Sequence, residues 1–150
     1  MFIFSQHRNP VMVIGVLGVC CTLSFPTCAQ APPAQPSPTS RATRGEDLYV
    51  SQCSACHQVN GEGVPGVFPP LKASGVVNKD DAAKHIHVVL YGMQGGRAGG
   101  VVYAAVMPPF AGMLSDADIA DIIDYERSSW GNHGKPVTAP QVAAERSRPQ

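Results

Sequence analysis

Cys53-Ser54-Ala55-Cys56-His57 is the stretch that decides the fold of this 150-residue chain. Its two cysteines are about one helical turn apart, so both thiols face the same side of a helix. At that spacing the thiols can add to the two vinyl groups on one edge of a porphyrin, and the next residue then offers its imidazole to the iron. The pattern predicts one haem, bound covalently through Cys53 and Cys56, with His57 as an iron ligand.

Two other kinds of site use cysteine pairs of this spacing. A structural zinc site needs two further Cys or His ligands at paired spacing, and the chain has no second cysteine pair beyond its N-terminal segment. A thioredoxin-like dithiol needs a βαβ context, which the helical and glycine-rich surroundings do not offer. Haem attachment is the preferred interpretation, and zinc binding and dithiol exchange are the alternatives.

The first 29 residues have the order of a secretory signal. Arg8 precedes an apolar run over 11–25, and small residues then lead to a cleavage position after Ala29. The run is shorter than the ~20 residues that cross a bilayer comfortably, although a retained anchor or a lipidated cysteine stays an alternative. Three of the five cysteines lie in this segment: Cys20, Cys21 and Cys28. A cleaved signal peptide predicts a periplasmic protein that keeps only Cys53 and Cys56.

The rest of the chain divides by composition into three parts. Residues 30–43 are rich in Pro, Ala, Ser and Thr, which predicts a flexible linker. Residues 44–132 form the predicted domain, and glycine and proline interrupt helical continuation at its end. The polar tail, 133–150, is expected to be loosely ordered.

Within the domain the sequence favours helices over strands. Helical spacing and capping residues indicate three of them, at about 46–56, 82–91 and 115–130. The glycine- and proline-rich segments between them supply little core, and a large apolar cofactor would provide what is missing. We expect an all-α domain of three to five short helices and Gly/Pro-rich loops around one haem.

Several short motifs strengthen this interpretation. They are Gly45-x-x-Leu48-Tyr49, Cys53-x-x-Cys56-His57, Gly61-x-Gly63, Phe68-Pro69-Pro70-Leu71, Met107-Pro108-Pro109-Phe110 and Trp130-Gly131-Asn132. Together they resemble class I cytochrome c domains over about residues 44–132, and more narrowly the monohaem cytochromes and cytochrome subunits of periplasmic dehydrogenases. The resemblance implies an electron carrier rather than an enzyme.

The resemblance also implies the kind of partner. Redox proteins are expected, such as a periplasmic dehydrogenase, a terminal oxidase or another cytochrome of a respiratory chain. Eleven Lys and Arg balance eleven Asp and Glu, so no basic field attracts nucleic acid or anionic lipid. Membrane association is expected only through a partner or an uncleaved N-terminus.

Met107 is the candidate for the second iron ligand. Two prolines follow it, and they hold its backbone out of helical conformation and stiffen the loop. The axial methionine of the family occupies such a Met-Pro position, so the resemblance implies that Met107 binds iron. A thioether ligand suits electron transfer. Met93 and Met113 are expected to pack or to touch the haem edge.

The histidines leave two alternatives open. His85 and His87 are two positions apart on a predicted helix and so point to different faces, and His133 lies in the tail. All three are expected not to bind iron, although bis-histidine ligation stays open. A haem enzyme or sensor with an open sixth position would need a distal base and an arginine, for which His87 and Arg97 are the candidates.

The last predicted helix carries one departure from the family pattern. The resemblance implies close contact between the first and last helices through Gly45, Tyr49, Tyr125 and Trp130. An apolar residue usually follows the tyrosine of the last helix, but here it is Glu126. This residue falls on the inner face of the helix, where its charge needs a partner. Arg127 and Arg44 are the expected partners.

Overall fold

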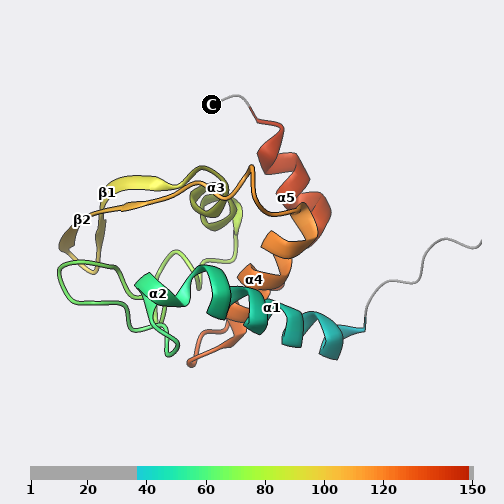
Figure 1. Cartoon of the computed structure of the whole chain (residues 1–150), viewed down its shortest axis with the longest axis horizontal. Coiled ribbons are helices and arrows are strands. Elements are labelled where there is room, and N and C mark those ends of the chain that lie inside the picture. The colour runs from blue at the N-terminus through green and yellow to red at the C-terminus, as the bar shows by residue number, and fades with distance from the viewer. Residues whose placement is uncertain (1–36, 149–150) are drawn as a thin grey trace, which may run out of the picture. The chain divides into compact units, whose positions relative to one another are not determined.

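The computed structural model describes residues 37–148 (Figure 1), so the predicted signal segment lies outside the described residues. The elements, in chain order, are α1 (Pro38–Gln52), α2 (Ser54–His57), α3 (Ala83–Tyr91), β1 (Met93–Ala98), β2 (Val101–Met107), α4 (Asp116–Ser128) and α5 (Ala139–Arg146). Within the described part, no helix has the length and apolar character that crossing a membrane requires. The mostly helical fold and its three predicted helices are confirmed.

Helices α1 and α4 cross at a point where only glycine fits. A Cβ built on Gly45 would lie 2.2 Å from the carbonyl oxygen of Asp121. Beside the crossing, the ring of Tyr49 packs 5.3 Å from Tyr125 and 5.0 Å from Trp130, measured between centroids. The predicted contact between the first and last helices is therefore confirmed.

The apolar core lies between α3, α4 and α5. Most of its side chains come from the inner faces of these helices, among them Ile86, Val89, Leu90, Ile119, Ile123 and Val142. Ser115 caps α4, because its hydroxyl accepts from the backbone N–H of Asp118 and the Asp118 carboxylate accepts from the N–H of Ser115. The core fixes how α3 and α4 face each other, and this arrangement positions one wall of the site.

β1 and β2 form a two-stranded hairpin in a region where the sequence predicted a glycine-rich loop. β1 and β2 pair antiparallel, and Gly99 and Gly100 connect them with φ of +55° and +82°. A two-residue hairpin turn of this kind needs positive φ at both positions, which glycine adopts freely. The signal in the sequence was Gly-Gly directly before the β-branched and aromatic run that begins at Val101.

The first helix begins earlier than predicted. Residues 38–43 were expected to belong to a flexible linker, but α1 starts at Pro38, with the hydroxyl of Ser37 accepting from a backbone N–H of the first turn. Arg41 then holds this end of the helix, since its guanidinium lies 2.7 Å from Asp121 and 3.0 Å from Asp124 on α4. Ion pairs to another helix thus provide the order that apolar residues do not.

The C-terminal tail also differs from the expectation of loose order. It contains α5, and the side chains of Val137 and Val142 are fully buried. At the start of the helix, the Gln141 side chain accepts from the backbone N–H of Thr138 at 2.8 Å. The Thr138 hydroxyl donates to the same oxygen at 2.9 Å, and the Thr-x-x-Gln spacing is the signature of a capping box. Val142 in the helix and Val137 just before it help to hold this mostly polar segment on the core.

Candidate functional site

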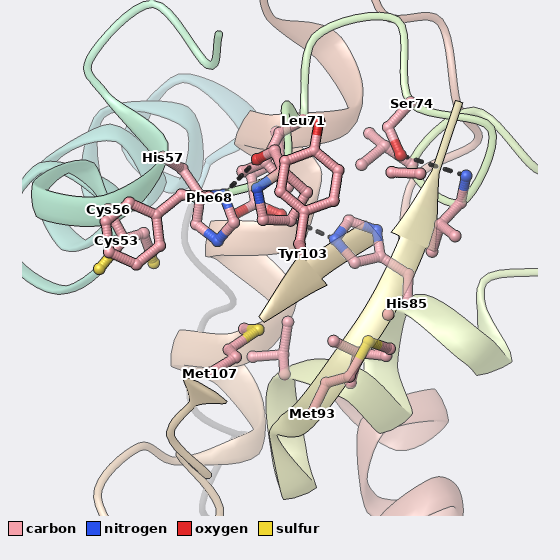
Figure 2. A pocket seen from close by; sticks show the side chains of 18 of the residues that line it. Cys53, Cys56, His57, Phe68, Leu71, Ser74, His85, Met93, Tyr103 and Met107 are labelled. Carbon is pink, nitrogen blue, oxygen red and sulfur yellow. Dashed lines mark hydrogen bonds and ion pairs between the residues drawn. The ribbon is translucent and has the colours of Figure 1, made fainter. Parts of the chain in front are cut away.

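A cavity of about 460 Å³ lies between the α1–α2 junction, α3, the hairpin and the inner face of α4. Its volume is within the range of cavities that enclose a cofactor. Most of its wall is apolar, with Phe68, Leu71, Val77, Val89 and Leu114 among the lining residues. The sulfur and imidazole groups that line it come from Cys53, Cys56, His57, His85, Met93 and Met107. All four predicted site residues therefore meet at one cavity (Figure 2).

The cysteine motif is held by the end of one helix and the start of the next. Cys53 donates its N–H to the carbonyl of Tyr49 at 2.9 Å, and His57 donates its N–H to the carbonyl of Cys53 at 3.0 Å. The two thiols are free and partly exposed. Burial raises the pKa of the Cys53 thiol well above its usual value, and the carboxylate of Glu126 adds to the effect.

This environment argues against the two other uses of the motif. Zinc binding and dithiol exchange both need a thiolate, and burial together with the Glu126 carboxylate disfavours the thiolate of Cys53 by raising its pKa. Among residues 37–148, no three His, Cys, Asp or Glu side chains lie together as a metal site would require. The cysteine pair has the environment of a cofactor attachment point, at the partly exposed end of an apolar cavity.

The imidazole of His57 is buried and fixed by one backbone group. Its Nδ1 lies 2.9 Å from the carbonyl oxygen of Pro69, shown as a dashed line in Figure 2. Because a carbonyl only accepts, the Nδ1 carries the proton and the Nε2 keeps a lone pair. A histidine that donates from one ring nitrogen and offers the other is prepared as a metal ligand.

Asn132 secures the segment that holds His57 in place. Its side-chain amide donates to the carbonyls of Leu71 at 3.1 Å and Glu126 at 2.8 Å, and its carbonyl oxygen accepts from the N–H of Ala73. The segment after Pro69 is thereby fastened to the end of α4. The Trp130-Gly131-Asn132 motif marked this residue in the sequence, but its bracing role was not predicted.

Met107 enters the cavity from the end of β2, on a different element from His57 (Figure 2). Close packing fixes its backbone, since a Cβ on Gly92 would lie 2.3 Å from the Met107 carbonyl oxygen. Gly92 has φ +73°, a conformation that glycine adopts without strain. Met93 also lines the cavity, from β1, whereas Met113 is 63% exposed and lies outside it.

Glu126 is buried on the inner face of α4, as predicted, but its partner is neither Arg127 nor Arg44. Its Oε2 lies 2.7 Å from the Nε2 of His85 on α3, and both side chains line the cavity (Figure 2). The Nδ1 of His85 is buried without any hydrogen-bond partner in the described part of the chain. This arrangement leaves one polar ring atom for a group that occupies the cavity to satisfy.

The two residues considered for a distal acid–base pair do not meet. His87 points away from the cavity, where its Nδ1 lies 3.1 Å from Glu145 and its ring packs on Tyr91. Arg97 lines the cavity from β1. His133 is exposed after α4 and meets the protein through its backbone N–H, which donates to the side chain of Asn78. The cavity therefore does not bring together His87 and Arg97, the pair considered for a distal base and arginine.

These features fit a c-type haem. The cavity has apolar walls for a planar macrocycle, two thiols at its partly exposed end, a histidine with a free Nε2, a thioether, and an unpaired His85 Nδ1. No residue in the wall conflicts with such a group, because the one buried carboxylate, Glu126, already has a partner.

Comparison with known proteins agrees with the site. The profile of the Cytochrome c family matches residues 42–130. The chain is 37% identical over 113 residues to cytochrome c-552 of Thermus thermophilus, a match that covers 69% of this chain and 85% of that protein.

Longer relatives are also similar. The chain is 36% identical over 89 residues to the cytochrome c subunit of alcohol dehydrogenase (quinone) from Gluconobacter oxydans, with 59% of this chain and 19% of that subunit covered. It is 36% identical over 104 residues to the gluconate 2-dehydrogenase cytochrome c subunit of Pantoea cypripedii, with 68% of this chain and 24% of that subunit covered. The chain thus spans about a fifth to a quarter of these subunits. It belongs to the cytochrome c family, whose members transfer electrons through a covalently bound c-type haem.

Proposed function

We propose that Cys53 and Cys56 hold one haem through thioether bonds and that His57 and Met107 are its two axial ligands. The observation that carries the proposal is the convergence of these four side chains on one apolar cavity. The free Nε2 of His57 and the proline-stiffened position of Met107 support the two ligand assignments. In the cavity, haem supplies an iron that accepts and releases a single electron.

The chain's own residues then determine the reduction potential of the iron and how closely water and a redox partner can approach it. A thioether ligand favours ferrous iron and raises the potential. The apolar wall excludes water from the centre, which keeps the rearrangement of charge on electron transfer small. Cys53 and Cys56 are partly exposed, so the attached edge lies near the surface, where a partner can approach it. We assign this edge as the entry and exit route for electrons.

We further propose that the protein works in the periplasm, accepting electrons from a dehydrogenase and donating them to a respiratory acceptor. Two observations support this assignment. Residues 1–29 have the pattern of a secretory signal, and relatives include cytochrome subunits of alcohol and gluconate dehydrogenases. The substrate of the dehydrogenase belongs to the partner protein.

The proposal is tested by producing the chain in a host that matures c-type cytochromes. Haem should stay on the polypeptide after denaturation, and the replacement of both Cys53 and Cys56 by Ala should abolish this. The ferric protein should show the weak red absorption band of sulfur-to-iron charge transfer, and Met107→Ala should lose it. A colourless protein would overturn the assignment of the cavity. Rapid binding of carbon monoxide to the reduced wild-type protein would instead indicate an open sixth position, as in an enzyme or sensor.

A further inference from the structure

The C-terminal helix reaches the loop that follows Met107. Arg146, in the last turn of α5, donates from Nη1 to the carbonyl of Ala111 at 2.5 Å and from Nη2 to the carbonyl of Leu114 at 3.1 Å. Its Nε lies 2.8 Å from the carboxylate of Asp116, the first residue of α4. All three guanidinium nitrogens thus contact one segment, 111–116. The planar fork of arginine suits such a set of acceptors, because its donors are fixed relative to one another.

The same loop is fastened to α3 on its other side. The N–H of Phe110 donates to the carbonyl of Val89 at 3.2 Å, and the N–H of Ala111 donates to the carbonyl of Leu90 at 3.0 Å. The ring of Phe110 is 6% exposed and belongs to the apolar core. The loop is therefore held from two directions, by α3 through backbone bonds and by α5 through Arg146.

Met107 pairs with Met93 across the hairpin and packs against the core, and only two residues separate it from this clamp. Pro108 and Pro109 are exposed, and neither has an N–H to donate. On the other side of Met107, the strand residue Val106 is also exposed, at 62%. The position of the Met107 sulfur therefore depends on the anchors of the loop on either side: the contact with Gly92 and the clamp at 110–116.

We propose that Arg146 is a positioning residue for Met107: it holds the loop so that the thioether stays at the cavity and excludes competing ligands. The inference rests on the proposed role of Met107 as an axial ligand. It assigns a role to α5, which lies beyond the residues 42–130 that the family profile matches. Loosening the loop increases the fraction of time in which the methionine is away from the cavity, since local opening is governed by the contacts of that segment.

The test compares Arg146→Ala with Arg148→Ala in the haem-loaded full chain. Arg148 is a matched control, because it lies just beyond α5, its side chain is 63% exposed, and within the described residues its one ion pair is with Glu145. Arg146→Ala should raise the rate at which the reduced protein binds carbon monoxide by roughly tenfold or more. It should also lower the pH at which the ferric sulfur-to-iron band disappears. Arg148→Ala should change neither quantity. Arg146→Lys should fall between the wild type and Arg146→Ala, because lysine can donate hydrogen bonds but lacks the planar fork of arginine.

Global destabilisation is separated by urea unfolding of each variant. The proposal requires that carbon monoxide binding accelerates at urea-free conditions where the variant is fully folded. It is overturned if Arg146→Ala binds carbon monoxide at the wild-type rate, or if Arg148→Ala accelerates binding as much. Met107→Ala distinguishes the two levels of the argument. If that variant keeps the sulfur-to-iron band, the ligand assignment is wrong; if it loses the band while Arg146→Ala behaves as wild type, only the positioning role fails.

Discussion

Two neighbouring residues of α4 carry opposite charges into the interior and are handled differently. Arg127 is 1% exposed and Glu126 is 3% exposed. The guanidinium of Arg127 donates to three backbone carbonyls, of Val77, Lys79 and Lys135, at 2.6 to 2.8 Å. Glu126 faces the cavity and has one ionisable partner, His85, whose second ring nitrogen is unpaired.

The difference separates a buried charge that stabilises the fold, Arg127, from one that lines the candidate site, Glu126. Burial lowers the pKa of Arg127, and the nearby carboxylates of Asp124 and Asp80 oppose the effect. Gly134 leaves room for the guanidinium, since a Cβ there would lie 2.7 Å from its central carbon. All three guanidinium nitrogens of Arg127 thus have hydrogen-bond partners within the protein. The Glu126–His85 pair is incomplete until something fills the cavity, and a buried polar atom without a partner is rare enough to mark such a place.

The largest expected effect on stability comes from removing the buried guanidinium of Arg127. Arg127→Met leaves three carbonyls without their donor, and we expect it to lower the free energy of unfolding by about 3–5 kcal/mol. Urea unfolding followed by far-ultraviolet circular dichroism measures this. Lys135→Ala is the control, because its ammonium is 70% exposed and pairs only with an exposed Asp80, a pair worth about 0–1 kcal/mol. If Arg127→Met lowered the free energy of unfolding by less than Lys135→Ala does, Arg127 would not be what stabilises this region.

The incomplete pair should behave differently when it is removed as a whole. Glu126→Leu or His85→Leu alone leaves a buried polar partner, so each should cost about 2–4 kcal/mol. The double replacement puts an apolar pair in an apolar wall, and we expect it to lie within about 1 kcal/mol of the wild type. The coupling is measured as a double-mutant cycle by urea unfolding of the haem-loaded protein. Additive single effects would mean that the two residues do not act as a pair.

The pair should also influence the haem, whereas exposed charges should not. Glu126→Gln removes a carboxylate without changing its size, and it cannot make the pair more negative whichever protons the pair holds. A pair with a net negative charge favours ferric iron, so neutralising such a pair should raise the midpoint potential, on the order of tens of millivolts. Asp80→Asn, at a carboxylate that is 78% exposed, should leave the potential within error. Spectroelectrochemical titration of both variants measures the difference, and equal potentials would show that the pair carries no net charge or lies out of reach of the iron.

The comparison also explains what the sequence could predict. Cys53, Cys56 and His57 could be predicted as site residues because their chemistry requires fixed local spacing, and the structure brings them to one cavity. Met107 was identified from its prolines and a family resemblance. The separation of His85 from His87 followed from helical geometry, and the structure places them on different faces. Which face turned inward was not predictable, because it depends on how α3 meets α4.

The missed elements share a physical cause. The first turns of α1 are held by Arg41, whose acidic partners are 80 or more positions away in the chain. Helix α5 depends on two buried valines and on the contacts of Arg146 with a distant loop. Polar composition indicated disorder in both places, since it reports the apolar surface available but not long-range ion pairs. The pairing of Glu126 with His85 belongs to the same class of long-range contact.

The smallest expected effect on stability comes from Asp118 in the first turn of α4, which serves as a reference for the buried charges. Burial raises the pKa of Asp118, but hydrogen bonds from Ser115 and Arg44 outweigh it, and the pKa lies below its usual value. A carboxylate with a lowered folded-state pKa stabilises the fold above its unfolded pKa and loses that contribution as the pH falls through the folded one. Wild-type protein should therefore lose its advantage over Asp118→Asn as the pH falls below about 4. The advantage at neutral pH should be about 0.5–1 kcal/mol. Urea unfolding at several pH values measures it, and a difference that does not change with pH would show that the amide caps the helix as well as the carboxylate does.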